Sequence, residues 1–285
     1  MLSKIAIVTD STNDLPQEYR EKYHIYVVPL TIVWGEKQYL DGVELKAEDF
    51  YAQLSSKSVF PTTSQPTPKQ FAEIYQQTLE DGATEIVVIT ISGAMSGTIG
   101  SARTAAENFP IPVHLFDSRS NSMSLGWEVL AAARVRDQGG NAEQMIAAAD
   151  NVRLGLHFHI ILETIDYLFQ GGRIAGAARL IGGLLHLRPQ IRVNHESGSV
   201  EAIDISRTRS QAIDHLYKGF FKYFDGNHPM HIAVLHNAAL AEAEALAERV
   251  RQEFNPQELI ITIVSPVLGV HTGPQALALC GYAEQ

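Results

Sequence analysis

Three short runs of aliphatic and β-branched residues in the first half of the chain predict strands that are buried on both faces of a mostly parallel sheet. They cover residues 4–9, 85–91 and 113–116, and helical patterns lie between them. A further strand is expected at residues 25–34, followed by a hairpin turn at 35–38. This order of strands and helices is typical of an open α/β sheet.

The second half of the chain predicts a second α/β unit. Strands are expected at residues 157–162, 231–235 and 259–264, a hairpin at 190–205, and helices at 175–187, 207–224 and 239–254. The character of the sequence changes near residue 154. We therefore expect two α/β domains, residues 1–153 and residues 154–285.

Polar residues follow three of the predicted parallel strands at the points where the strands end. They are Asp10 and Ser11, then Ser96, Gly97 and Thr98, and finally Asp117 and Ser118. The carboxyl ends of parallel strands meet at one edge of a sheet, which is where open α/β proteins bind ligands. The second group leads into a helix expected at residues 99–108, so its hydroxyls and free amides suit an anion. The alternative is that these small residues only cap the helix.

Two further segments contribute candidate binding residues. Residues 61–68 contain three prolines, which would present the hydroxyls of Thr63 and Ser64 rigidly, and a solvated turn is the alternative. His271 lies between Gly269 and Gly273 in what we expect to be a loop. A glycine-flanked backbone can approach a ligand closely, which makes this histidine a better candidate than the others.

Composition and charge limit the classes of function. The net charge of −10 and the lack of a Lys/Arg tract argue against a nucleic-acid partner, although Arg188, Arg192, Arg207 and Arg209 leave room for a local basic face. The single cysteine, Cys280, excludes an intramolecular disulfide, and no metal site is expected. No basic-then-apolar leader precedes the first strand, so a cytoplasmic location is expected. The longest apolar run, residues 181–187, is too short to span a bilayer, which needs about 20 residues, so no stable membrane insertion is expected.

A series of short motifs resembles the DegV family of bacterial fatty-acid-binding proteins, and they occur in the family's order over nearly the whole chain. They are TDST at residues 9–12, TSQPTP at 63–68, SGT at 96–98, DS at 117–118, YLFQGGRI at 167–174, RPQI at 188–191 and HTGP at 271–274. Each motif alone is weak, and together they are a strong signal.

The resemblance implies a long-chain fatty acid buried in a tunnel between two α/β domains, with no cofactor besides this ligand. In the family, the Thr of TSQ, the Ser of SGT and the His before Gly-Pro hold the carboxyl group, and these match Thr63, Ser96 and His271 here. The family protein catalyses no reaction itself but presents the carboxylate to a fatty acid kinase, which forms an acyl phosphate. The family has Gly-Pro-Gly after the histidine, whereas this chain has Gln275 at the last position. Residues expected beside the carboxylate are Ser64, Gly97 and Thr98, with Asp10, Ser11, Asp117, Ser118 and Arg173 as supporting candidates.

Two alternatives concern the chemistry of the site. A serine-dependent lipid or ester hydrolase would use Ser96 as nucleophile and His271 as base, with Asp117 as the orienting acid, although the chain has no G-x-S-x-G elbow. A nucleotide-dependent enzyme is a weaker hypothesis, because neither a Walker A nor a G-x-G-x-x-G motif occurs.

Arg173, Arg207 and Arg209 are candidates for docking a kinase, and local packing or solvation is the alternative for them.

Overall fold

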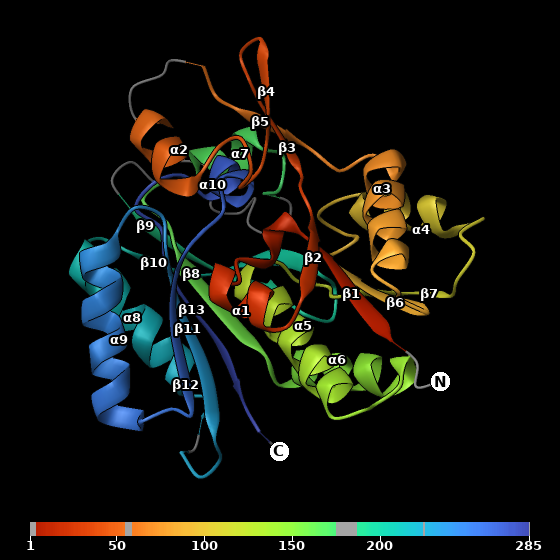
Figure 1. Ribbon diagram of the computed structural model, residues 1–285. Coiled ribbons are helices and arrows are strands. Elements are labelled where there is room, and N and C mark those ends of the chain that lie inside the picture. The colour runs from red at the N-terminus through yellow and green to blue at the C-terminus, as the bar shows by residue number, and fades with distance from the viewer. Residues whose placement is uncertain (1–3, 55–58, 175–186, 225, 285) are drawn as a thin grey trace.

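The computed structural model describes residues 4–54, 59–174, 187–224 and 226–284. A four-stranded parallel sheet with the order β2-β1-β6-β7 forms the first part of the fold (Figure 1). Its strands are β1 (Ile5–Asp10), β2 (Ile25–Val28), β6 (Glu85–Thr90) and β7 (Val113–Asp117). The expected parallel sheet is therefore confirmed, and the carboxyl ends of β1, β6 and β7 lie next to one another.

Helices cover both faces of this sheet. α3 (Pro68–Glu80) and α4 (Thr98–Ala106) pack on one face, and α5 (Ser122–Asp137) and α6 (Ala142–Gly155) pack on the other. α5 is buried on nearly all sides, which is the property of a helix enclosed by other elements. It contacts β1 and β6 on one side and β13 of the next sheet on the other. α5 is thus the central helix between the two main sheets.

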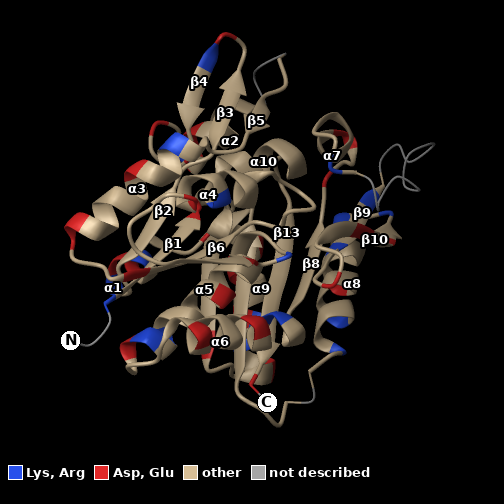
Figure 2. Cartoon of the chain, turned by 90° about the vertical axis from the view of Figure 1, so that its right-hand side faces the viewer, with Lys and Arg blue, Asp and Glu red and all other residues tan. Residues whose placement is uncertain are grey.

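A six-stranded mixed sheet with the order β10-β9-β8-β13-β11-β12 forms the second part. Its strands are β8 (His157–Ile161), β9 (Arg188–Asn194), β10 (Ser199–Ser206), β11 (Met230–His236), β12 (Glu258–Ile263) and β13 (Leu277–Ala283). α8 (Arg209–Phe221) and α9 (Leu240–Phe254) cover its outer face. Figure 2 shows the charged residues mainly on the helices and at the edges of the fold, whereas β8 and β13 in the middle carry none.

A small antiparallel sheet with the order β4-β3-β5 corrects two expectations. The strand expected at residues 25–34 is divided, because Pro29 has no N–H to continue the first sheet, and the chain enters the small sheet after it. Part of the proline-rich stretch, which was expected to be irregular, pairs with the small sheet as a short strand. The three strands are β3 (Thr31–Trp34), β4 (Lys37–Leu40) and β5 (Thr62–Ser64).

Short helical elements complete the fold. They are η1 (Ser11–Asn13), α1 (Gln17–Lys22), α2 (Ala47–Leu54), α7 (Asp166–Gln170) and α10 (Pro266–Thr272). The predicted loop around His271 is wrong, since this residue lies in the last turn of α10. Pro266 begins this helix at a position where a missing N–H is tolerated.

Two sequence-based expectations are not decided by these elements. The helix expected at residues 175–187 falls almost entirely outside the described residues. The domain division between residues 153 and 154 stays a prediction, although the parallel sheet uses only strands before it and the six-stranded sheet only strands after it. Within the described ranges, no helix is long and apolar enough to cross a bilayer.

Candidate functional site

A cavity of about 330 Å³ lies between the inner face of the six-stranded sheet and the loops that follow β1, β5 and β6. Its sheet side is apolar, because alternate residues of each strand point to the same face. On β8, Phe158 and Ile160 line the cavity, whereas His159 between them packs against Phe220 of α8 on the outer face. The other strand residues of this apolar wall include Ile191, Val193, Val200, Leu235 and Ala278.

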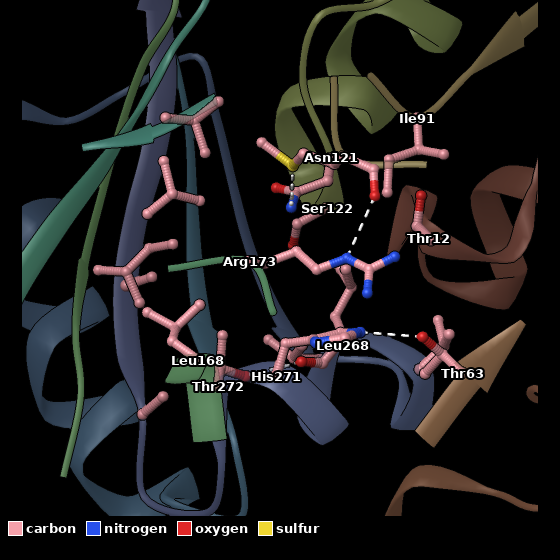
Figure 3. Close-up of a pocket in the computed structure, with 18 of the residues that line it drawn as sticks. Thr12, Thr63, Ile91, Asn121, Ser122, Leu168, Arg173, Leu268, His271 and Thr272 are labelled. Carbon is pink, nitrogen blue, oxygen red and sulfur yellow. Dashed lines mark hydrogen bonds between the residues drawn. The ribbon is translucent and has the colours of Figure 1, made fainter. Parts of the chain in front are cut away.

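The remaining lining is rich in hydroxyl, amide and basic side chains. They come from loops, from η1, β5 and α10, and from the first residue of α5, and the close-up in Figure 3 shows several of them directed toward one another. They are Thr12, Thr63, Ser64, Gln65, Ser96, Asn121, Ser122, Arg173, Asn237, His271 and Thr272. The cavity therefore has an apolar wall and a polar part that could hold one charged group.

His271 and Thr63 meet in the polar part. The Nε2 atom of His271 lies 3.0 Å from Oγ1 of Thr63, which joins α10 to β5. Burial, together with the nearby Arg173 guanidinium, lowers the pKa of His271 to about 4, so the imidazole is neutral at pH 7. Its Nδ1 atom is buried without a partner among the described residues and lies against the backbone of Gly171, where an added Cβ would be 2.1 Å away.

Arg173 extends its guanidinium group into the same space (Figure 3). Its Nε donates to the carbonyl oxygen of Met95 at 3.3 Å, and its Nη1 donates to the carbonyl oxygen of Gly171 at 2.8 Å. Within the described part of the chain, Nη2 has no hydrogen-bond acceptor. This arginine can thus fix the loop after β6 and still offer a donor pair to an anion.

Ser96 lines the cavity, and its neighbours in the sequence position it. Its Oγ lies 2.8 Å from Oγ1 of Thr98, which is fully buried. Gly97 is the N-cap of α4, and the side chain of Gln65 covers it so closely that a Cβ would lie 2.1 Å from Gln65 Oε1. Gly97 and Thr98 are therefore placed behind the lining, and a direct role for them in holding a carboxylate stays a prediction.

The supporting candidates at the strand ends shape the loops around the cavity. Asp10 accepts from the backbone N–H groups of Thr12 at 2.9 Å and Ile91 at 2.7 Å. Asp117 accepts from the N–H groups of Gly93 at 3.1 Å and Arg119 at 2.9 Å. Ser11 donates to Asp41, and Ser118 donates to the carbonyl oxygen of Ser120. None of Asp10, Ser11, Asp117 and Ser118 belongs to the described lining, so their importance for a ligand is indirect.

Buried aspartates fix the N-terminus of the helix that carries His271. Asp14 accepts from the N–H of Ser265 at 2.9 Å, and Asp41 accepts from the N–H of Val267 at 3.2 Å. Both thus satisfy free amides at the start of α10. Burial raises the pKa of Asp14 to about 6 and that of Asp41 to about 7.

Asn237 fixes the other end of α10. Its Nδ2 donates to Oγ1 of Thr272 at 2.8 Å and to the carbonyl oxygen of Gly273 at 2.6 Å. Asn237 could not be assigned to the site from the sequence, because it lies 35 residues before Thr272 in the chain. Asn121, Ser122 and Gln65 were also not assigned to the site from the sequence, although Gln65 belongs to the TSQ motif.

The geometry does not assemble the hydrolase arrangement. Ser96 Oγ is hydrogen-bonded to Thr98, and His271 Nε2 is hydrogen-bonded to Thr63. The Asp117 carboxylate accepts from two backbone amides, one in the loop after β6 and one in the loop after β7. A nucleophile, a base and an orienting acid in hydrogen-bond contact are needed for that chemistry, and among the described residues these three are not in contact.

Comparison with known proteins places the chain among relatives of the same length. The sequence pattern of the DegV family, described as uncharacterised proteins, matches residues 4–284. A DegV domain-containing protein of Streptomyces coelicolor is 38% identical over 280 residues, which are 98% of each chain.

Solved structures share the expected fold. The structure of a DegV family protein from Thermus thermophilus, reported with its fatty acid binding, has a TM-score of 0.90 and 31% identity, covering 99% of this chain and 100% of that chain. The structure of DegV from Bacillus subtilis, a fatty acid binding protein, has a TM-score of 0.91 and 28% identity over 99% and 100% of the two chains.

Proposed function

Since the chain belongs to the DegV family, we propose that it binds a long-chain fatty acid in the cavity between the six-stranded sheet and the loops of the parallel sheet. The observation that carries this proposal is the division of the lining into an apolar wall and a polar part. The acyl chain would lie along the strand residues of the wall. The carboxylate would lie at the polar part, near Thr63, Ser96, His271 and Arg173.

The polar part suits a carboxylate because its donors are neutral or positively charged. Arg173 supplies a charge and an Nη2 group that has no acceptor among the described residues, and the hydroxyls of Ser96 and Thr63 can donate to the same anion. His271 is neutral at pH 7 in the ligand-free protein, because burial lowers its pKa to about 4. A carboxylate beside it would favour the protonated imidazole and so raise this pKa.

The apolar wall supplies most of the binding free energy. An acyl chain of ~16 carbons buries ~15 CH₂ groups at about 0.8 kcal/mol each, which gives roughly 12 kcal/mol before the costs of ordering the ligand. An association cost of about 4 kcal/mol leaves a net binding free energy of about 8 kcal/mol, which corresponds to a micromolar dissociation constant. The contacts of the carboxylate add to this binding free energy. The cavity volume of about 330 Å³ lies at the lower end of the range of about 300 to 1,000 Å³ that ligand pockets usually have.

We further propose that the bound carboxylate is presented to a fatty acid kinase. Support comes from the position of the polar part, since Ser64 and Gln65 in its lining are exposed at the surface. The protein would then act as a carrier that needs no cofactor of its own, and the phosphorylation would be the task of the partner.

The experiment that tests fatty acid binding is native mass spectrometry of the purified protein, combined with analysis of the lipid extracted from it. We expect a mass increase of one fatty acid per chain and recovery of that fatty acid in about equimolar amount. A stripped sample incubated with palmitate or oleate should regain the same increase. Spectra that contain only unliganded protein after this incubation would contradict the proposal.

A further inference from the structure

A second cavity, of about 360 Å³, lies at the end of β8 and β9 and is bordered by an unusual concentration of basic side chains. We define it as the basic pocket. Its basic residues come from three separate stretches of the chain, which are residue 119, residues 153–159 and residues 192–195. They are Arg119 after β7, Arg153 of α6, His157 and His159 of β8, Arg192 of β9 and His195 in the turn after β9. Such a cluster is notable in a protein with a net charge of −10.

The basic pocket lies next to the fatty-acid cavity but has a different lining. His157, His159 and Arg192 alternate along β8 and β9 with residues such as Phe158 and Val193, whose side chains belong to the core around the first cavity. Phe158 and Val193 contribute to the lining of both cavities. The two cavities are therefore neighbours, and the basic side chains named above border only the second of them.

Two of the three arginines already have a carboxylate partner, and the third does not. Arg153 is paired with Asp150, and Arg192 is paired with Glu201 at 2.8 Å. Arg119 donates from Nη1 to the carbonyl oxygen of Glu196 at 3.1 Å, and it forms no ion pair with the described residues. Its backbone adopts a φ of 50°, a left-handed conformation that is uncommon for a residue with a side chain. Residues held in this way are often found at ligand sites.

One histidine of the pocket has ring nitrogens that lack hydrogen-bond partners. Both Nδ1 and Nε2 of His195 are buried without a partner among the described residues. Buried polar groups are nearly always hydrogen-bonded, so these nitrogens need an explanation such as a bound ligand or water. Burial lowers the pKa of His195 to about 4, with His157 and Arg153 adding to the effect, and an anion nearby would oppose this.

We propose that the basic pocket binds the phosphate group of a small phosphorylated molecule. Guanidinium groups match the geometry and charge of phosphate, and imidazole N–H groups can donate to its oxygens. The carboxylate of Glu196, which also borders the pocket, lies on the exposed side. Leu154 and Leu156 add apolar surface, which would accommodate a short hydrocarbon part of the ligand.

The test measures binding of inorganic phosphate and of butyl phosphate to the full-length protein by titration calorimetry. Saturable binding with millimolar or lower dissociation constants is expected for at least one of them. Tighter binding of butyl phosphate would assign the site to phosphate carried on an apolar group, whereas equal or tighter binding of inorganic phosphate would assign it to the free ion. The absence of saturable binding for both probes would overturn the proposal.

Arg119→Gln is the informative variant, because it removes a guanidinium without leaving a carboxylate unpaired. We expect it to weaken phosphate binding about tenfold or more, the usual effect of losing a hydrogen bond to a charged group. Arg103→Gln on α4 is the matched control, since Arg103 is exposed and lies outside the pocket, and it should change affinity less than about twofold. An equal loss of phosphate affinity in both variants would show that only the overall charge of the protein matters, and it would overturn the proposed phosphate site.

His195→Gln provides a second, independent variant. Phosphate should shift the His195 ring resonances in nuclear magnetic resonance spectra of the wild-type protein, and His195→Gln should weaken binding with an unchanged unfolding midpoint. Unshifted His195 resonances at saturating phosphate would also overturn the site. Measurements on lipid-stripped and lipid-loaded protein keep this test separate from the fatty-acid proposal, because neither readout depends on a bound fatty acid.

Discussion

At the level of single residues, the polar part of the fatty-acid cavity combines one charged donor with several neutral ones. Arg173 is anchored by the carbonyl oxygens of Met95 and Gly171, and His271 is anchored by Thr63. Each donor is therefore already oriented before a carboxylate arrives, which reduces the cost of ordering side chains on binding. Among these donors, the hydroxyls of Thr63 and Ser96 are the groups whose removal should disturb the folded protein least.

We expect Thr63→Ala and Ser96→Ala each to weaken fatty acid binding about tenfold or more while the protein stays folded. Each change removes one hydrogen bond to a charged group, worth about 1.5 to 3 kcal/mol, and leaves the apolar wall intact. Competition with a fluorescent fatty acid would measure the change. Thr104→Ala on the exposed side of α4 is the matched control and should bind like the wild type. Wild-type affinity in both cavity variants would contradict the assignment of the carboxylate site.

Gln275 is the residue at which this chain departs from the Gly-Pro-Gly pattern, and its backbone explains why glycine suits the position. It adopts a φ of 60°, a left-handed conformation that costs a residue with a side chain about 1 to 2 kcal/mol. Its N–H donates to the carbonyl oxygen of Asn237 at 2.7 Å, so the strained backbone also holds the segment after α10.

Gln275→Gly is therefore expected to raise the free energy of unfolding by about 1 kcal/mol, measured by urea denaturation. Gln275→Ala is the control, because it also loses the side-chain hydrogen bond to Ala238 but keeps the cost of the left-handed backbone. Glycine should be more stable than alanine at this position. An equal stability of the two variants would show that the conformation costs little here.

At the level of elements, the strands of the parallel sheet could be predicted because their apolar runs are continuous and local. The meeting of polar residues at the ends of β1, β6 and β7 followed from that sheet type. α10 could not be predicted, since its start is fixed by Asp14 and Asp41, which lie 251 and 226 residues away from their backbone partners. The division of residues 25–34 depended on a single proline between two otherwise continuous strand patterns. The apolar wall of the cavity could not be predicted, because its residues come from strands that are far apart in the chain.

Asp41 allows a test of how α10 is held. Burial raises its pKa from 3.8 to about 7, and the nearby Asp14 and Asp10 carboxylates contribute to the rise. The folded state therefore binds more protons than the unfolded state between pH 4 and pH 7. Its contribution to stability is complete below about pH 4 and is lost as the pH rises toward 7.

Asp41→Asn cannot titrate, so the stability of the wild type relative to this variant should fall as the pH rises from 4 to 7. Urea denaturation at several pH values would measure the difference. Asp49→Asn removes an exposed carboxylate from α2 and serves as the control. A difference between wild type and Asp41→Asn that does not change with pH would show that Asp41 is not the buried, protonated group described here.

At the level of the whole molecule, the two main sheets share one core through α5, and the fatty-acid cavity and the basic pocket are neighbours that share Phe158 and Val193 in their linings. The arginines considered for kinase docking fall into different structural classes. Arg209 is paired with Glu242 by two hydrogen bonds of 3.0 and 2.6 Å and so joins α8 to α9. Arg173 lines the fatty-acid cavity, and Arg207 is exposed.

Arg207 is therefore the arginine that tests docking without disturbing the fold or the ligand. We expect Arg207→Glu to raise the kinase's apparent KM for the fatty-acid-loaded protein, and to do so more at low salt than at high salt. An exposed charge steers association over about 10 Å at 0.1 M salt, and added salt screens it. Arg103→Glu on the exposed side of α4 makes the same charge change elsewhere and should have a smaller effect. Arg209→Glu would be less informative, because it places a second carboxylate beside Glu242 and should lower stability.

Unchanged KM values for Arg207→Glu at both salt concentrations would remove Arg207 from the docking surface. Fatty acid binding would be unaffected by that result, because it depends on the cavity and is measured by mass spectrometry without the kinase.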